Sequence, residues 1–257
     1  SILNSHFSKQ SPRVGLAYAQ FFIRQGDFRR AERLLEKISE AKPTEISALK
    51  LLADVKLKEE DWMAAEKIAD RIRAVDNMNA AAYQISGAAL AGMQNPEESQ
   101  AAYKKAYEAT PEAGQAMAAL VQAYLKDGDV AEAERFLNEA LGSSENKYLA
   151  RTLMAQIQFH SNNPQKAEKL IKEAIDSDPA EASGYVMLAR HYLSQDRQKE
   201  AQDILAEGMK TAADQFMLKI TQAEIYEVSG ANFDAIKIYE ELLEERPNSE
   251  IVANNLA

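Results

Sequence analysis

Apolar residues recur along the chain at a spacing of three or four positions, and short polar turns interrupt them. Leu34, Leu35 and Ile38 show this spacing, which places apolar side chains on one face of an α-helix. Turn signals separate the segments, as at positions 25–27 (Gln-Gly-Asp) and 162–164 (Asn-Asn-Pro). No useful length of sequence alternates apolar and polar residues, so the pattern predicts an all-α protein of short helices.

The pattern repeats every 34 residues, and three columns of mostly small residues carry the period. The first column is Ala31, Ala65, Ser99, Ala133, Ala167, Ala201 and Ala235. The second is Ala19, Ala53, Gly87, Val121, Ala155, Ala189, Ala223 and Ala257. The third is Ile38, Ile72, Ala106, Ala140, Ala174, Gly208 and Leu242. Because helices approach closely where one presents a small side chain, these columns are expected to be buried between helices.

These features resemble those of a tetratricopeptide repeat protein. The resemblance rests on the small-residue columns, on an aromatic residue near the turn such as Phe28 or Trp62, and on prolines such as Pro43 and Pro111 that close alternate repeats. It implies helix-turn-helix repeats stacked into a right-handed superhelical solenoid. The expected seven repeats are 12–45, 46–79, 80–113, 114–147, 148–181, 182–215 and 216–249. Residues 1–11 are expected to be the remnant of a preceding repeat helix, and residues 250–257 the start of a further repeat.

Four positions depart from the pattern of this family. Val121 replaces a small residue, Lys56 and Gln158 occupy positions that are usually apolar, and Phe233 lies one place later than the usual aromatic. These departures are expected to alter individual packing contacts and to leave the fold unchanged.

Composition excludes several classes of function. The chain carries 30 basic and 40 acidic residues and a formal net charge of −10, whereas nucleic-acid binding requires clustered cations, so no nucleic-acid partner is expected. Cysteine is absent, which excludes disulfides and thiolate metal sites. No apolar run reaches the roughly 18 residues of a membrane-spanning helix, and no direct membrane insertion is expected.

The sequence contains no arrangement typical of catalysis. His6, His160 and His191 are isolated from one another, and no phosphate-binding or nucleophile motif occurs. His160 and His191 are expected to be half-exposed polar residues. The prediction is therefore a protein that is not an enzyme and has no metal site and no cofactor.

The resemblance implies that the first helices line a concave face. In the family's geometry, the second, fifth, sixth, ninth, twelfth and thirteenth residues of each repeat point there. In the first two repeats these are Arg13, Leu16, Ala17, Gln20, Ile23, Arg24, Ser47, Lys50, Leu51, Asp54, Leu57 and Lys58. The terminal-carboxylate clamp of co-chaperone members is not expected, since Asp54 stands where the clamp needs an asparagine.

The expected partner site is a groove over the fourth to sixth repeats. Its residues are Gln122, Leu125, Lys126, Leu153, Gln156, Phe159, Val186, Met187, Arg190 and Leu193. The amides suit the backbone of an extended peptide, and the apolar members form a strip typical of interaction surfaces. Lys126 and Arg190 would offer charge to an acidic group on the ligand. The alternative, in which these residues complete the core of the first-helix layer, stays open.

The function implied by the resemblance is a non-catalytic scaffold that binds a protein or peptide. Similar arrays occur in bacterial envelope proteins of exopolysaccharide, pilus and secretion systems, so an envelope or periplasmic location is expected, with a cytoplasmic one as the alternative. Net charges of +3 over residues 1–45 and −5 over residues 216–257 keep open a scaffold that forms homo-oligomers. A regulatory arm of an enzyme whose catalytic domain lies outside this segment also stays open.

Overall fold

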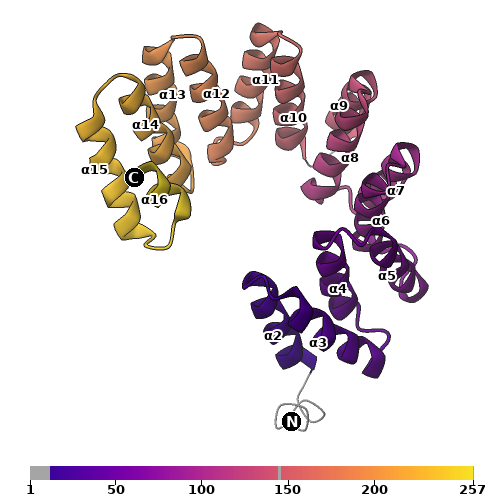
Figure 1. Ribbon diagram of the computed structural model, residues 1–257. Helices are drawn as coiled ribbons and strands as arrows, with labels where there is room; N and C mark the ends of the chain where they lie inside the picture. Colours follow the sequence, from indigo (N-terminus) through magenta and orange to yellow (C-terminus); the bar gives the residue numbers. More distant parts are fainter. Residues whose placement is uncertain (1–11, 144–145, 257) are drawn as a thin grey trace. The chain divides into compact units, whose positions relative to one another are not determined.

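The computed structural model describes residues 12–143 and 146–256, which form 15 α-helices and no strand (Figure 1). The first helices of successive pairs are α2 (Pro12–Arg24), α4 (Ile46–Lys58), α6 (Ala80–Gly92), α8 (Gly114–Asp127), α10 (Lys147–His160), α12 (Ala182–Ser194), α14 (Phe216–Val228) and α16 (Glu250–Leu256). The second helices are α3 (Phe28–Ala41), α5 (Trp62–Val75), α7 (Pro96–Ala109), α9 (Val130–Ser143), α11 (Pro164–Ser177), α13 (Gln198–Thr211) and α15 (Asn232–Glu245). The prediction of an all-α fold is confirmed for this part of the chain.

The chain divides into two compact units, which we call unit 1 (residues 1–133) and unit 2 (residues 134–257). The expected remnant helix at residues 1–11, with His6, lies outside the described residues, and so does Ala257.

In each pair, the turn between the two helices contains one residue with a left-handed backbone conformation. These residues have φ between 57° and 86° and recur every 34 positions: Gly26, Glu60, Gln94, Gly128, Asn162, Asp196 and Gly230. Glycine adopts this conformation without steric cost, and asparagine and aspartate tolerate it better than most residues. Asp27 and Asp61 then cap α3 and α5, because their carboxylates accept hydrogen bonds from the backbone N–H groups of Arg30 and Ala64. The turns that punctuate the sequence are thus the points where the chain reverses direction.

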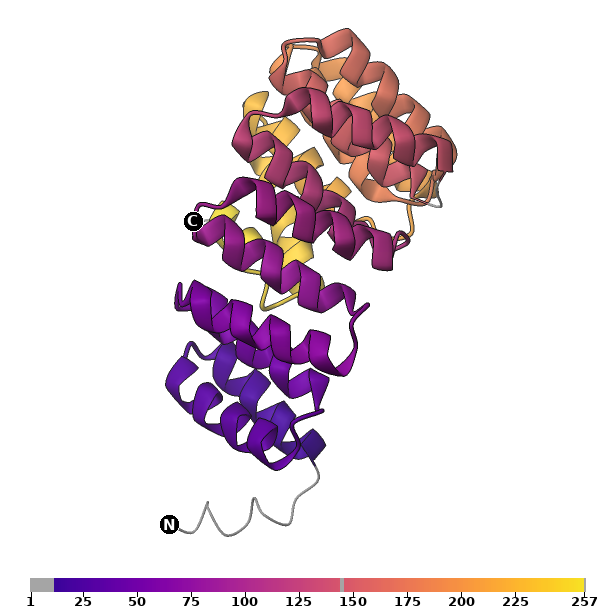
Figure 2. The same ribbon diagram turned by 90° about the vertical axis from the view of Figure 1, so that its right-hand side faces the viewer.

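Within each unit, every helix pair stacks on the next. In unit 1, α4 packs against α3, α5 and α6, and in unit 2, α12 packs against α11, α13 and α14. Figure 2 shows the helices of unit 1, in indigo to purple, in successive layers. A pair therefore buries its apolar faces against its neighbours and not around one central core.

The small-residue columns form the tightest contacts of this stack. Every member of the first column is at most 2% exposed, and the described members of the second column are buried as well. Val121, the departure from small residues in the second column, is 1% exposed. In the third column, Ile38 is half-buried and the other members are buried. The expectation that these columns lie between helices is confirmed, with Ile38 as a partial exception.

Two glycines in these columns are required by aromatic neighbours. A Cβ atom added to Gly87 would lie 2.8 Å from the ring of Tyr103, and one added to Gly208 would lie 2.8 Å from Tyr185. Tyr185 cannot move away easily, because it is 1% exposed and its hydroxyl donates to the carbonyl oxygen of Pro179 at 3.2 Å. Each ring thus occupies space that a larger residue in the facing helix would need.

The polar departures at Lys56 and Gln158 are explained by carboxylates from the preceding helix pair. The Lys56 ammonium donates to Glu32, and the Gln158 amide donates to Glu134. In both cases the glutamate lies 24 positions earlier, on a second helix. A buried polar group costs little stability when its hydrogen-bonding partner is in place, so these substitutions are compatible with the apolar stack.

The same contact recurs at Tyr192, whose hydroxyl donates to Glu168 at 3.0 Å. Glu168 also accepts from Arg197 at 2.8 Å and from Lys172 at 2.7 Å. Partial burial opposes ionisation of Glu168, but the hydrogen bonds from Arg197, Lys172 and Tyr192 outweigh it and lower its pKa to about 2. Glu168 is therefore ionised at neutral pH and links α11, α12 and the turn that precedes α13.

Candidate functional site

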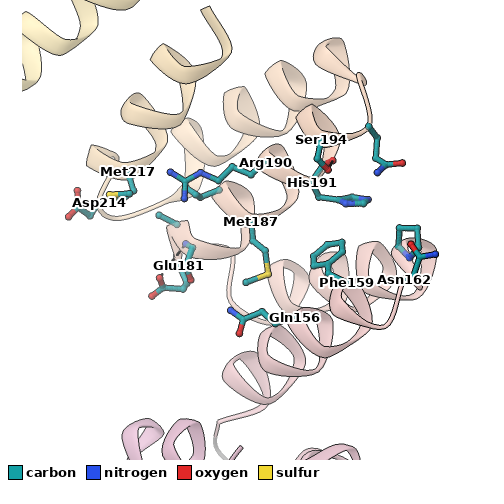
Figure 3. Close-up of a pocket in the computed structure, with 15 residues that line it drawn as sticks. Gln156, Phe159, Asn162, Glu181, Met187, Arg190, His191, Ser194, Asp214 and Met217 are labelled. Atoms are coloured by element: carbon teal, nitrogen blue, oxygen red, sulfur yellow. Dashed lines mark hydrogen bonds between the residues drawn. The ribbon is translucent and has the colours of Figure 1, made fainter. Parts of the chain in front are cut away.

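Unit 2 contains an open groove of about 760 Å³ between first helices (Figure 3). We call it the unit 2 groove. Its lining residues come from α10, the start of α11, α12, the start of α14 and the adjoining turns: Gln156, Phe159, Asn162, Pro164, Glu181, Ala182, Ser183, Val186, Met187, Arg190, His191, Ser194, Gln195, Asp214 and Met217.

The floor of the unit 2 groove is apolar. Figure 3 shows Met187 reaching from α12 toward Phe159 and Gln156 on α10. Phe159 and Met187 are half-buried and pack against the core of unit 2, as does Met217, and Val186 belongs to that core. Half-buried apolar side chains at an open surface can bury further area against a ligand, which is the main driving force for association.

His191 lies against this floor and not at the surface. Its ring centroid is 4.5 Å from that of Phe159, with 34° between the planes, and the residue is only 8% exposed. The expectation of a half-exposed histidine was wrong, because the phenyl ring covers the imidazole. Burial lowers the pKa of His191, which favours the neutral imidazole at neutral pH. His160, the other described histidine, is exposed.

The charged groups around the groove are mostly paired with each other. The guanidinium of Arg190 donates to both carboxylate oxygens of Glu224, at 3.0 and 2.8 Å. Asp214 accepts from the backbone N–H of Phe216 at 2.9 Å and from Arg246 at 3.0 Å, and both hydrogen bonds lower its pKa. An acidic ligand group would have to compete with Glu224 for Arg190.

The structure brings together half of the residues predicted for the partner site. Those in the unit 2 groove are Gln156, Phe159, Val186, Met187 and Arg190.

The other predicted residues lie elsewhere. Leu153 is 9% exposed and does not line the groove. Leu193 is half-buried and packs against the core of unit 2. Gln122, Leu125 and Lys126 are on α8, which belongs to unit 1. Gln122 and Lys126 are exposed there and Leu125 is half-buried.

Several lining residues were not singled out in the sequence. Ser183 and Met217 each occupy the second position of an expected repeat, so the positional rule contained the signal for both. Asn162, Glu181 and Asp214 come from turns between helices. Whether these turn residues line the groove depends on how neighbouring helix pairs stack. The periodic pattern of a single helix does not indicate it.

A second, smaller groove lies in unit 1 between α2 and α4, with a volume of about 440 Å³. We call it the unit 1 groove. Its lining residues are Gln20, Ile23, Arg24, Leu51, Asp54, Leu57 and Lys58. All seven stand at positions that the family geometry assigns to the concave face.

The described part of the chain contains neither a metal-ligand cluster nor a membrane-spanning helix. No group of three or more His, Asp or Glu residues there could hold a metal ion. None of the helices that the structure describes combines the length and the apolar character needed to cross a bilayer.

Comparisons with known proteins agree with the helix-pair architecture. The sequence profile of the tetratricopeptide repeat family matches residues 22–91, 90–157 and 158–225. The chain is 27% identical over 177 residues to human tetratricopeptide repeat protein 21B, which covers 67% of this chain and 13% of that protein. It is 22% identical over 240 residues to anaphase-promoting complex subunit 7 of Arabidopsis thaliana, covering 93% of this chain and 42% of that protein. The chain therefore spans less than half the length of these relatives.

A solved structure shows the same fold. The crystal structure of a tetratricopeptide repeat protein from Parabacteroides merdae superposes with a TM-score of 0.57 at 15% sequence identity, and the match covers 95% of this chain and 96% of that one. The three profile matches together cover most of the chain. The chain belongs to the tetratricopeptide repeat family.

Proposed function

We propose that the chain is a non-catalytic scaffold that binds an extended segment of a partner protein in the unit 2 groove. Proteins of this family bind proteins or peptides, and the fold is consistent with such a scaffold. The observation that carries the proposal is the combination of an apolar floor with a polar side chain that has no hydrogen-bonding partner among the described residues.

That side chain is the amide of Gln156, which is exposed at the groove and makes no hydrogen bond to any residue that the structure describes. An amide both donates and accepts, so it matches the alternating N–H and C=O groups of an extended backbone. Met187 and Phe159 lie beside it and supply the surface for an apolar side chain of the same segment. Such a ligand would form hydrogen bonds with the amide of Gln156 and would also bury the apolar floor of the groove.

The charges of the groove indicate which segments it favours. Arg190 is neutralised by Glu224, whereas Glu181, an exposed residue that also lines the groove, forms no salt bridge within the described residues. An acidic segment would meet Glu181 and Asp214 and would compete with Glu224. We therefore propose that the ligand is apolar with neutral or basic residues beside its anchor.

Met187→Glu is expected to weaken binding of such ligands by roughly tenfold or more, because a carboxylate on the floor would lose its hydration when the ligand closes over it. The measurement uses fluorescence anisotropy with neutral or basic peptides selected on the wild-type chain from a displayed library of random linear peptides. Val228→Glu is the matched control, since Val228 is also in unit 2, is 73% exposed and does not line the groove.

Equal affinities of the selected peptides for wild type and Met187→Glu would contradict the proposal, provided that both proteins keep the same helical content. Equal losses in Met187→Glu and Val228→Glu would contradict it too, because they would indicate a general effect of negative charge.

The finer features of the function stay predictions from the sequence resemblance. These are the role in a bacterial envelope assembly and the division into seven repeats. Self-assembly is the second open function, and light scattering over a range of protein concentration and salt tests it, because self-association raises the apparent mass.

A further inference from the structure

We infer that the unit 1 groove is a second binding site, selective for an acidic segment that also carries aliphatic side chains. This inference goes beyond the proposed function, because it concerns another unit of the chain and a ligand of the opposite charge.

The helices that line the unit 1 groove are strongly basic. α2 and α4 together contain five basic residues and one acidic residue, Asp54. Lys56 is engaged by Glu32 and Glu59. Arg24 and Lys58 line the groove, and Lys50 lies near Asp54. None of these three cations forms a salt bridge with another described residue. They therefore leave positive charge available at and beside the unit 1 groove.

Asp54 does not neutralise this charge by pairing. Partial burial in the groove raises the pKa of its carboxyl group, and the nearby Lys50 and Lys58 lower the pKa by a smaller amount. The carboxylate is thus a single negative charge among three cations. Arg24, Lys50 and Lys58 together with Asp54 carry a net charge of +2, although the whole chain has a formal net charge of −10.

The walls between these charges are apolar. Ile23, Leu51 and Leu57 are half-buried and pack against the core of unit 1, so they are held in place before a ligand arrives. An anchoring aliphatic side chain can bury against them, while acidic neighbours on the same segment reach Arg24 and Lys58. Charge complementarity of this kind steers association and discriminates against segments of the wrong sign. The unit 2 groove differs on this point, because its arginine is already paired and Glu181 is one of its lining residues.

The test measures binding of two labelled synthetic peptides to the whole chain with Met187→Glu, because this substitution impairs the unit 2 groove, where the lysine peptide would otherwise be expected to bind. One contains leucine, serine and glutamate in equal parts, and the other has lysine in place of each glutamate. The glutamate peptide is expected to bind at least roughly tenfold more tightly at low salt, and the difference is expected to shrink as salt screens the charges. Equal binding of the two peptides would overturn the inference.

Charge reversal locates the site. Arg24→Glu with Lys58→Glu is expected to weaken binding of the glutamate peptide by roughly tenfold or more. Lys67→Glu with Arg71→Glu makes the same change in net charge on exposed positions of α5 that do not line the groove, and it is expected to change affinity less than about threefold. Equal losses in the two double variants would overturn the inference, since they would indicate attraction to unit 1 as a whole.

Basic residues in the last turns of α2 and α4 stabilise these helices, so reversing their charges could disturb the fold. A second variant without reversed charges tests the site independently of this effect. Arg24→Gln with Lys58→Gln keeps side chains of similar length and is expected to weaken binding of the glutamate peptide about threefold or more. Unchanged affinity in this folded variant would overturn the inference. Met187→Glu is expected to leave this affinity unchanged, so a failure of this site and a failure of the unit 2 groove can be told apart.

Discussion

Leu188→Ala is expected to lower the free energy of unfolding of unit 2 by about 2–5 kcal/mol. Leu188 is completely buried on α12, in the core that this helix shares with residues of α11, α13 and α14. Removing the side chain leaves a cavity that a close stack of helices fills only in part. The loss is expected at α12 and at the helices that contact it, because each pair is stabilised mainly by its neighbours.

Chemical denaturation followed by circular dichroism measures the loss for Leu188→Ala, and amide hydrogen exchange locates it. Exchange should accelerate first in α11 to α14. Ile236→Ala on α15 is the control, since Ile236 is 45% exposed and its truncation is expected to cost less than about 0.5 kcal/mol. Similar losses for both variants would contradict a core built from stacked pairs.

Gly92→Ala is expected to destabilise unit 1 by about 1–3 kcal/mol, although alanine is the better helix former. A Cβ atom at Gly92, the last residue of α6, would overlap the indole ring of Trp62 on α5. Trp62 packs half-buried against the core of unit 1, so moving the ring disturbs the residues behind it. The clash therefore outweighs the gain in helix propensity.

The matched variant for Gly92→Ala is Gly142→Ala on α9, where an added Cβ would meet no atom within 4 Å. There only the higher helix propensity of alanine acts, and the free energy of unfolding is expected to rise by up to about 1 kcal/mol. Thermal unfolding of the two variants gives the comparison. Stabilisation by both substitutions would show that Trp62 does not restrict this position.

The fold could be predicted from the sequence because each helix pair makes nearly the same contacts as the next one. Ala167 and Ala201 are both buried because each lies where two helices approach closely. This contact repeats every 34 residues. Gly26 and Gly128 likewise mark turns that require a left-handed backbone. Glu60 and Gln94 adopt the same conformation without any residue preference that indicates it. The turn at Glu60 follows from the period alone, whereas Asn95 and Pro96 also indicate the one at Gln94.

The polar contacts between pairs could not be seen in a single helix. Lys56 and Gln158 are polar residues on an otherwise apolar helix face. Their hydrogen bonds to Glu32 and Glu134 explain why they are tolerated there. The spacing of 24 positions could have identified these partners, since it joins a second helix to the first helix that stacks on it. The burial of His191 could not be predicted from its own helix, because it comes from Phe159 on the preceding first helix.

The candidate site was predicted only in part, because residues at equivalent repeat positions do not have equivalent surroundings. Leu153 and Met187 are 34 positions apart, yet only Met187 lines the unit 2 groove. The groove depends on the side chains of one particular neighbour pair and on turns such as the one that contains Asp214. The position of a residue in its repeat therefore identifies it as a candidate for the groove. The side-chain packing of each helix pair determines which candidates line it.

The proposed binding site is tested most directly by methyl NMR of methionine, because the chain has eight methionines and two of them, Met187 and Met217, line the unit 2 groove. Met63 and Met78 are 67% and 63% exposed in unit 1 and report nonspecific apolar contact. A saturating library-selected peptide is expected to shift the methyl resonances of Met187 and Met217 and to leave those of Met63 and Met78 in place. Shifts at Met63 or Met78 with no change at Met187 and Met217 would contradict the account.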